Sequence, residues 1–114
     1  MTEAGLPSPV RGDVWWVSLD PTQGSEVRKT RPCLVLTANA LNRHRQTVVV
    51  VPYSTGAETH APITVPVTCQ GKGAVAVVDQ VRAIAKRRLR SRLEAASPAD
   101  LAAVGEALMR ILEL

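Results

Sequence analysis

The spacing of apolar and polar residues predicts a run of short strands and then one amphipathic helix. Segments rich in β-branched and aromatic residues alternate with turn-forming segments. The predicted strands cover residues 13–19, 32–37, 47–51, 63–68 and 74–84. The segment 47–51 is almost entirely apolar, which predicts burial on both faces. Pro66 interrupts its strand and so predicts an edge position, and 74–84 is long enough to contain a bend.

The period of the pattern changes near the end of the chain. Ser97, with Asp100 three residues later and Pro98 between them, is typical of a helix N-terminus. The apolar residues that follow recur at helical spacing, and they are Leu101, Val104, Leu108 and Ile111. Residues 38–45 are expected to form a short helical turn. These elements predict a mainly β fold, a small and strongly bent barrel with a C-terminal α-helix packed on it.

Polar segments divide the chain at predicted loops and turns. Residues 1–10 are expected to be a flexible lead-in, and residues 11–114 a single domain, because 114 residues suffice for one core. Loops are predicted at 20–31 and 54–60, and a turn at 70–73. No internal repeat is evident.

Composition excludes several classes of protein. Hydrophobic residues make up 46% of the chain, too many for a disordered protein, and the longest apolar run, 48–53, is too short to cross a membrane. The first ten residues do not have the pattern of a secretory signal. Cys33 and Cys69 form no metal-binding spacing and are expected to be reduced thiols in a cytoplasmic protein. A net charge of +4 is compatible with an anionic partner but only weakly indicates one.

The loop at 20–31 has the densest group of candidate binding residues. Glu26, Arg28 and Lys29 lie close to Arg31, which directly precedes Pro32. A residue before proline is confined to extended geometry, so the direction of the Arg31 side chain is set by the backbone. Its guanidinium could fork onto a phosphate, or it could be a surface arginine paired with Glu26.

Three further segments carry polar residues in suggestive places. Ser54 and Thr55 follow the central apolar strand and could bind a phosphate or satisfy loop backbone groups. Asp79 and Gln80 lie in a predicted apolar strand, where an acid and an amide need partners or an exposed edge. The basic run at 86–92 leads toward the terminal helix and is interpreted as a solvated or structural segment.

Taken together, these segments resemble the MazF/PemK/Kid toxin family. The resemblance covers about residues 10–114, and it rests on 11–21 (RGDVWWVSLDP), 24–26 (GSE), 29–36 (KTRPCLVL), 48–55 (VVVVPYST), 73–84 (GAVAVVDQVRAI) and 86–89 (KRRL). It implies an SH3-like β-barrel of the CcdB/MazF type and a homodimer. It also implies an endoribonuclease of a type II toxin–antitoxin system that cleaves single-stranded RNA, usually messenger RNA, at short motifs. The implied reaction needs neither metal nor cofactor, because the ribose 2′-OH attacks the adjacent phosphorus.

The resemblance also assigns roles by position. Arg31, Ser54 and Glu26 match catalytic positions. The RNA-binding positions are matched by Lys29, Thr55, Asp79 and Gln80, and in some members the acid at position 79 is the proposed base. Val77 stands where the Kid branch has an arginine two positions before that acid, so a scheme based on Arg31 and Ser54 fits better. Few aromatic residues are present, which predicts that hydrogen-bonding loops hold RNA rather than a long stacking platform.

Two alternatives remain open from the sequence. CcdB-type toxins have a similar fold and poison DNA gyrase by protein contact, although the combination of Arg31, Ser54 and Glu26 favours the enzyme. The other alternative is an inactive relative that only binds an antitoxin or RNA. The resemblance further implies a MazE-like antitoxin as partner.

Overall fold

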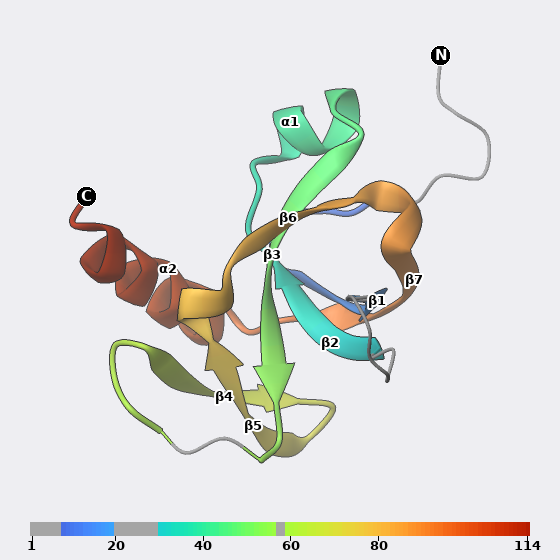
Figure 1. Ribbon diagram of the computed structural model, residues 1–114. Coiled ribbons are helices and arrows are strands. Elements are labelled where there is room, and N and C mark those ends of the chain that lie inside the picture. The colour runs from blue at the N-terminus through green and yellow to red at the C-terminus, as the bar shows by residue number, and fades with distance from the viewer. Residues whose placement is uncertain (1–7, 20–29, 57–58) are drawn as a thin grey trace, which may run out of the picture.

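The computed structural model describes residues 8–19, 30–56 and 59–114, and its strands form one curled antiparallel sheet (Figure 1). The strands run along the sheet in the order β4–β5–β3–β2–β1–β7, and β6 pairs with β3. Their bounds are β1 Asp13–Ser18, β2 Thr30–Val35, β3 Thr47–Ser54, β4 Thr64–Cys69, β5 Lys72–Val77, β6 Arg82–Ala85 and β7 Leu89–Ala95. The helices are α1 Asn39–His44 and α2 Pro98–Leu112, and 3₁₀ turns cover Val78–Gln80 and Lys86–Arg88.

Strand β3 is the centre of the sheet, because it pairs with three other strands. Its start pairs with β6, its middle with β2, and its last two residues with β5. Val48 and Val50 belong to one apolar cluster, whereas Val51 and Tyr53 belong to another. The predicted burial of this strand on both faces is therefore confirmed.

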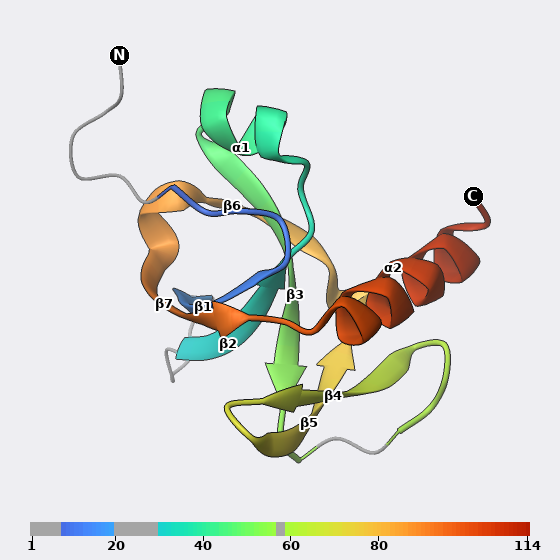
Figure 2. The same cartoon turned by 180° about the vertical axis from the view of Figure 1, so that it is seen from behind.

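Helix α2 closes the second cluster, packing against β4 and the 3₁₀ turn that follows β5 (Figure 2). The Ser97 side chain accepts a hydrogen bond from the Asp100 backbone N–H at 3.0 Å, which caps the helix as predicted. Val104 and Ala107 are buried in the cluster, and Leu101, Leu108 and Ile111 pack against it. The expected mainly β fold, with its C-terminal helix and short helical turn, is confirmed.

Four details of the sequence prediction are wrong. Strand β2 begins at Thr30 rather than at residue 32, because Arg31 and Thr30 pair with β1. Strand β3 runs on to Ser54 through its pairing with β5. Asp79 and Gln80 lie in a 3₁₀ turn, not inside a strand, because the buried Val78 and its backbone bond to Ile63 bend the chain there. The basic run forms a 3₁₀ turn and most of β7, a strand that pairs with β1 and that the sequence pattern did not predict.

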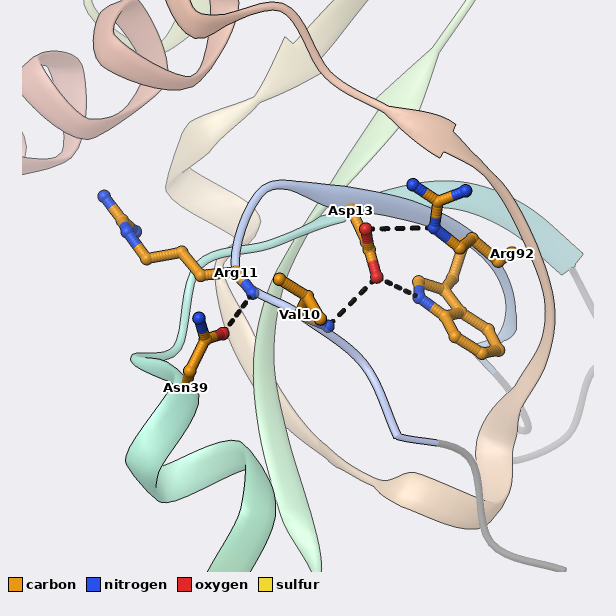
Figure 3. Close-up of polar contacts among 6 residues, drawn as sticks. Val10, Arg11, Asp13, Asn39 and Arg92 are labelled. Carbon is orange, nitrogen blue, oxygen red and sulfur yellow. Dashed lines mark hydrogen bonds and ion pairs between the residues drawn. The ribbon is translucent and has the colours of Figure 1, made fainter.

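Polar contacts hold the first described residues and β7 to β1 (Figure 3). The Asp13 carboxylate is buried and accepts hydrogen bonds from Arg92 Nε at 3.1 Å, Trp15 Nε1 at 3.2 Å and Val10 N at 3.0 Å. The Arg11 backbone N–H also donates to Asn39 Oδ1 at 2.7 Å, which connects this segment to α1. These bonds position the start of β1, the strand whose other end pairs with the start of β2.

Among the described residues, no helix is both long enough and apolar enough to cross a membrane.

Candidate functional site

The start of β2 and the end of β3 bring Arg31 and Ser54 to the same end of the sheet. The register pairs Cys33 with Pro52 and Leu34 with Val51. Arg31 and Ser54 each lie two residues beyond the last of these pairs, where β2 stays paired with β1 and β3 turns to pair with β5. Both residues nevertheless line the same cavities.

Two cavities open at this end of the sheet, and Arg31, Tyr53 and Ser54 line both of them. The larger has a volume of about 430 Å³ and the smaller about 200 Å³. The larger is also lined by Trp16, Thr30, Pro32, Thr55, Cys69, Gln70, Lys72, Gly73 and Ala74. The smaller is also lined by Pro52, Val77 and Gln80. Arg31 and Ser54 can therefore reach a ligand that extends through both.

The Ser54 hydroxyl is positioned by the loop that follows β3. It accepts a hydrogen bond from the Gly56 backbone N–H at 3.2 Å. A hydroxyl that accepts through its oxygen keeps its own proton to donate. The Ser54 hydroxyl can therefore bind the loop backbone and donate a hydrogen bond to a ligand at the same time. From the sequence, these two roles were considered as alternatives.

Positive charge gathers around the buried Cys33 thiol beside this site. Burial raises the pKa of Cys33 to about 12, against the opposing effects of the Arg82 and Arg31 guanidinium groups. Arg82 pairs with Val50 across β3 and β6 and so projects from the same face as Cys33 and Arg31. Arg82 is not among the described residues that line either cavity. The cavity-lining residues that sequence reasoning missed include Trp16, Gln70 and Lys72.

Tyr53 lines both cavities and is 2% exposed. Its hydroxyl is buried and makes no hydrogen bond within the described parts of the chain. Burial raises the pKa of this phenol well above its usual value, and the nearby Asp100, Cys69, Glu94 and Cys33 add to the effect. The phenol is therefore neutral at physiological pH and can still donate one hydrogen bond.

The other predicted site residues differ in whether they line one of the two cavities. Thr55 is exposed and lines the larger cavity, and Gln80 lines the smaller one. Asp79 is exposed on the 3₁₀ turn and is not among the described residues that line either cavity. Glu26 and Lys29 lie outside the described residues.

The basic run at 86–92 contributes structural contacts. Lys86 is buried, and its backbone N–H donates to the Gln46 carbonyl at 2.9 Å. Arg88 donates to the Ser18 carbonyl at 3.3 Å, and Arg92 binds Asp13. Within the described ranges, no three His, Cys, Asp or Glu side chains come close enough together to hold a metal ion.

Comparisons with known proteins point to one family. The model of the family described as "PemK-like, MazF-like toxin of type II toxin-antitoxin system" matches residues 10–112. The chain is 42% identical over 89 residues to endoribonuclease PemK of Escherichia coli, covering 74% of this chain and 67% of that protein. It is 34% identical over 113 residues to endoribonuclease MazF9 of Mycobacterium tuberculosis, covering 91% of this chain and 96% of that protein. A chain of the MazE–MazF crystal structure from Deinococcus radiodurans superposes with a TM-score of 0.81 at 27% identity, covering 95% of this chain and 98% of that chain.

Proposed function

The chain belongs to the PemK-like, MazF-like toxin family of type II toxin–antitoxin systems, and we propose that it is an endoribonuclease whose active site lies between β2 and β3. One observation carries the proposal: Arg31 and Ser54 line both cavities at the end of the sheet. Residues 11–114 form the toxin domain and residues 1–10 its lead-in. The curated relatives PemK and MazF9 are themselves named endoribonucleases.

The proposed reaction cleaves single-stranded RNA by transesterification. The ribose 2′-oxygen attacks the adjacent phosphorus and loses its proton, and the bond from phosphorus to the 5′-oxygen breaks. The products are a 2′,3′-cyclic phosphate and a 5′-hydroxyl that has taken up a proton. This chemistry requires a 2′-OH, which explains a preference for RNA over DNA without any reading of bases.

Arg31 and Ser54 stabilise the charge that develops on the phosphate oxygens. A guanidinium presents two parallel donors to phosphate oxygens, and the Ser54 hydroxyl supplies a third. Both come from strands, so their positions are set before the substrate binds, and a fixed donor of this kind typically contributes about 3 kcal/mol to transition-state stabilisation. No metal is required in this scheme.

The remaining residues predicted from the sequence are assigned supporting roles. Glu26 completes the catalytic group in this proposal and Lys29 binds RNA. Thr55 and Gln80 contact RNA through the larger and the smaller cavity, respectively. We assign Asp79 to RNA binding rather than proton transfer, because its exposed carboxylate on the 3₁₀ turn is not part of the lining that Arg31 and Ser54 share.

We further propose that the protein acts in the cytoplasm as a homodimer and is neutralised by a MazE-like antitoxin. The Deinococcus radiodurans relative was crystallised as a MazE–MazF complex. Met109 and Leu112 are about half exposed on α2 and offer apolar surface to a partner chain. An antitoxin with an acidic tail would bind the basic site electrostatically, so rising salt is expected to weaken the complex.

Incubation of one long RNA with the purified protein in EDTA tests the activity. Primer extension is expected to reveal stops at a short recurrent sequence, which reports endonucleolytic cleavage and the recognition motif together. Family membership favours this outcome over the gyrase-binding alternative. Intact RNA combined with inhibition of gyrase supercoiling would contradict the proposal and support that alternative.

A further inference from the structure

The hairpin formed by β4 and β5 borders the same cavity as Arg31 and Ser54. The hairpin contributes Gln70 and Lys72 to the lining of the larger cavity. Backbone pairing of Ser54 with Val75 joins β5 directly to the end of β3. The hairpin is therefore held beside the candidate catalytic hydroxyl by the sheet itself.

The turn of this hairpin has an unusual residue at its first central position. Gln70 and Gly71 have φ angles of 53° and 80°, the left-handed geometry of a type I′ turn. Asn or Gly normally occupies the first position, because other side chains are strained there. A glutamine at this position is locally unfavourable, yet Gln70 is among the residues that line the larger cavity.

Two carboxylates fix the hairpin from outside. Asp100 of α2 accepts a hydrogen bond from the Thr68 backbone N–H at 3.0 Å, and Glu94 of β7 accepts one from the Gln70 backbone N–H at 2.7 Å. β4 is the edge of the sheet, where backbone groups lack a neighbouring strand. These bonds satisfy an edge N–H and the turn N–H, and they leave the Gln70 side chain free of this anchoring.

The lining of the larger cavity suits a nucleotide. Its volume of about 430 Å³ falls within the range of small-molecule sites, roughly 300 to 1,000 Å³. The half-buried Trp16 gives an aromatic surface, and Gln70 offers both donors and an acceptor. Lys72 and Arg31 supply positive charge, which an apolar ligand would not use.

We propose that the larger cavity is a specificity subsite, which takes one unpaired nucleobase next to the phosphate bound by Arg31 and Ser54. Gln70 reads the edge of the base, Trp16 contacts its ring, and Lys72 binds the next phosphate along the strand. The proposal rests on the proposed endoribonuclease function, and it assigns the choice of sequence partly to the β4–β5 hairpin.

The Gln70 assignment is tested with substitutions that suit the turn better than glutamine does. Gln70→Gly removes the amide, and Gln70→Asn shortens it, while both residues accept a positive φ. Cleavage is compared on RNA oligonucleotides in which each base around the mapped site is varied in turn. We expect discrimination at one position to fall about 10-fold or more in Gln70→Gly, with a changed preference in Gln70→Asn. Unchanged motifs in both variants would overturn the assignment while leaving the endoribonuclease function intact.

The Lys72 assignment is tested by binding, with Arg43→Ala as the matched control. Arg43 is an exposed cation on α1, at the end of the molecule away from the hairpin (Figure 1). The probe is a fluorescent oligonucleotide carrying the mapped site with deoxyribose at the cleaved position. Lys72→Ala should bind it about 5- to 10-fold more weakly and lower the slope of log K against log salt by about 0.7, the value for one phosphate contact on a single strand.

Equal affinity and equal salt slope in Lys72→Ala and the wild-type protein would overturn the phosphate contact. A loss of the same size in Arg43→Ala would also overturn it, because the effect would then follow from net charge alone. Wild-type protein that neither binds nor cleaves any RNA would overturn both the subsite and the proposed function.

Discussion

Removal of the Asp13 carboxylate should destabilise the fold far more than removal of its ion-pair partner Arg92. Asp13 is 5% exposed and accepts three hydrogen bonds, whereas the Arg92 side chain is 51% exposed. An ion pair with one solvent-exposed partner contributes at most about 0.5 kcal/mol after screening. The bonds from Trp15 and Val10 to a charged, buried acceptor contribute about 1 kcal/mol each.

These magnitudes predict a clear order of stabilities. Asp13→Ala should lower the free energy of unfolding by about 2 to 3 kcal/mol, because it removes all three bonds and leaves the Trp15 N–H without its acceptor. Arg92→Ala should lower it by about 0.5 kcal/mol, because the carboxylate keeps its two other donors, Trp15 and Val10. The double variant should resemble Asp13→Ala, since the two residues share one interaction.

Urea unfolding followed by tryptophan fluorescence and circular dichroism measures these differences. Glu106→Ala is the matched control, because Glu106 is an exposed acid on α2 outside this network, and it should stay within about 0.5 kcal/mol of wild type. If Arg92→Ala costs as much as Asp13→Ala, or if Asp13→Ala is as stable as wild type, the structural role assigned to Asp13 is wrong.

Three further predictions concern residues at or beside the candidate site. Ser54→Ala should slow RNA cleavage roughly 100-fold while Ser54→Thr retains most of the rate, because only the hydroxyl is required; equal single-turnover rates for Ser54→Ala and wild type would refute this. Cys33 stays protonated in the folded chain up to about pH 12 but ionises near 9.0 when unfolded, so stability should fall as pH rises above 9. Cys33 alone contributes a slope of about 1.4 kcal/mol per pH unit, so the slope measured in urea titrations should be smaller by about that amount in Cys33→Ala than in wild type. Tyr53→Phe should raise the free energy of unfolding by about 1 kcal/mol, because it removes a buried hydroxyl without a partner in the described structure; a loss of stability in thermal unfolding would reveal a hydrogen bond to that hydroxyl.

The local spacing of apolar and polar residues predicted most of the helices and strands correctly. The cap at Ser97 and the apolar face of α2 follow from spacing within one helix, and the burial of β3 follows from its run of valines. The failures occurred where pairing across the sheet decides the outcome. Arg31 joins β2 because its backbone pairs with Val17, although its side chain is polar and the sequence around it is typical of a loop.

The candidate site was only partly predictable for the same reason. Arg31 and Ser54 stood out because each adjoins a proline or a buried strand. The hairpin residues Gln70 and Lys72 reach the site only because β5 pairs with the end of β3. Contacts such as that between Arg92 and Asp13, 79 positions apart, have no local signature either.

The scarcity of aromatic residues has a different meaning in the structure than in the sequence. It predicted that stacking would contribute little to RNA binding. Two of the three aromatic residues, Trp16 and Tyr53, line the larger cavity, so the few rings present are concentrated at the candidate site. We therefore expect one base contact with Trp16 in addition to hydrogen bonds.

The rate of RNA cleavage by Arg31→Ala, measured in EDTA against wild type and Arg43→Ala, tests the central claim most directly. Circular dichroism and urea unfolding first establish that each variant is folded. The proposed mechanism predicts cleavage at least about 100-fold slower in Arg31→Ala and a wild-type rate in Arg43→Ala. A folded Arg31→Ala protein that cleaves the same RNA as fast as wild type would contradict it.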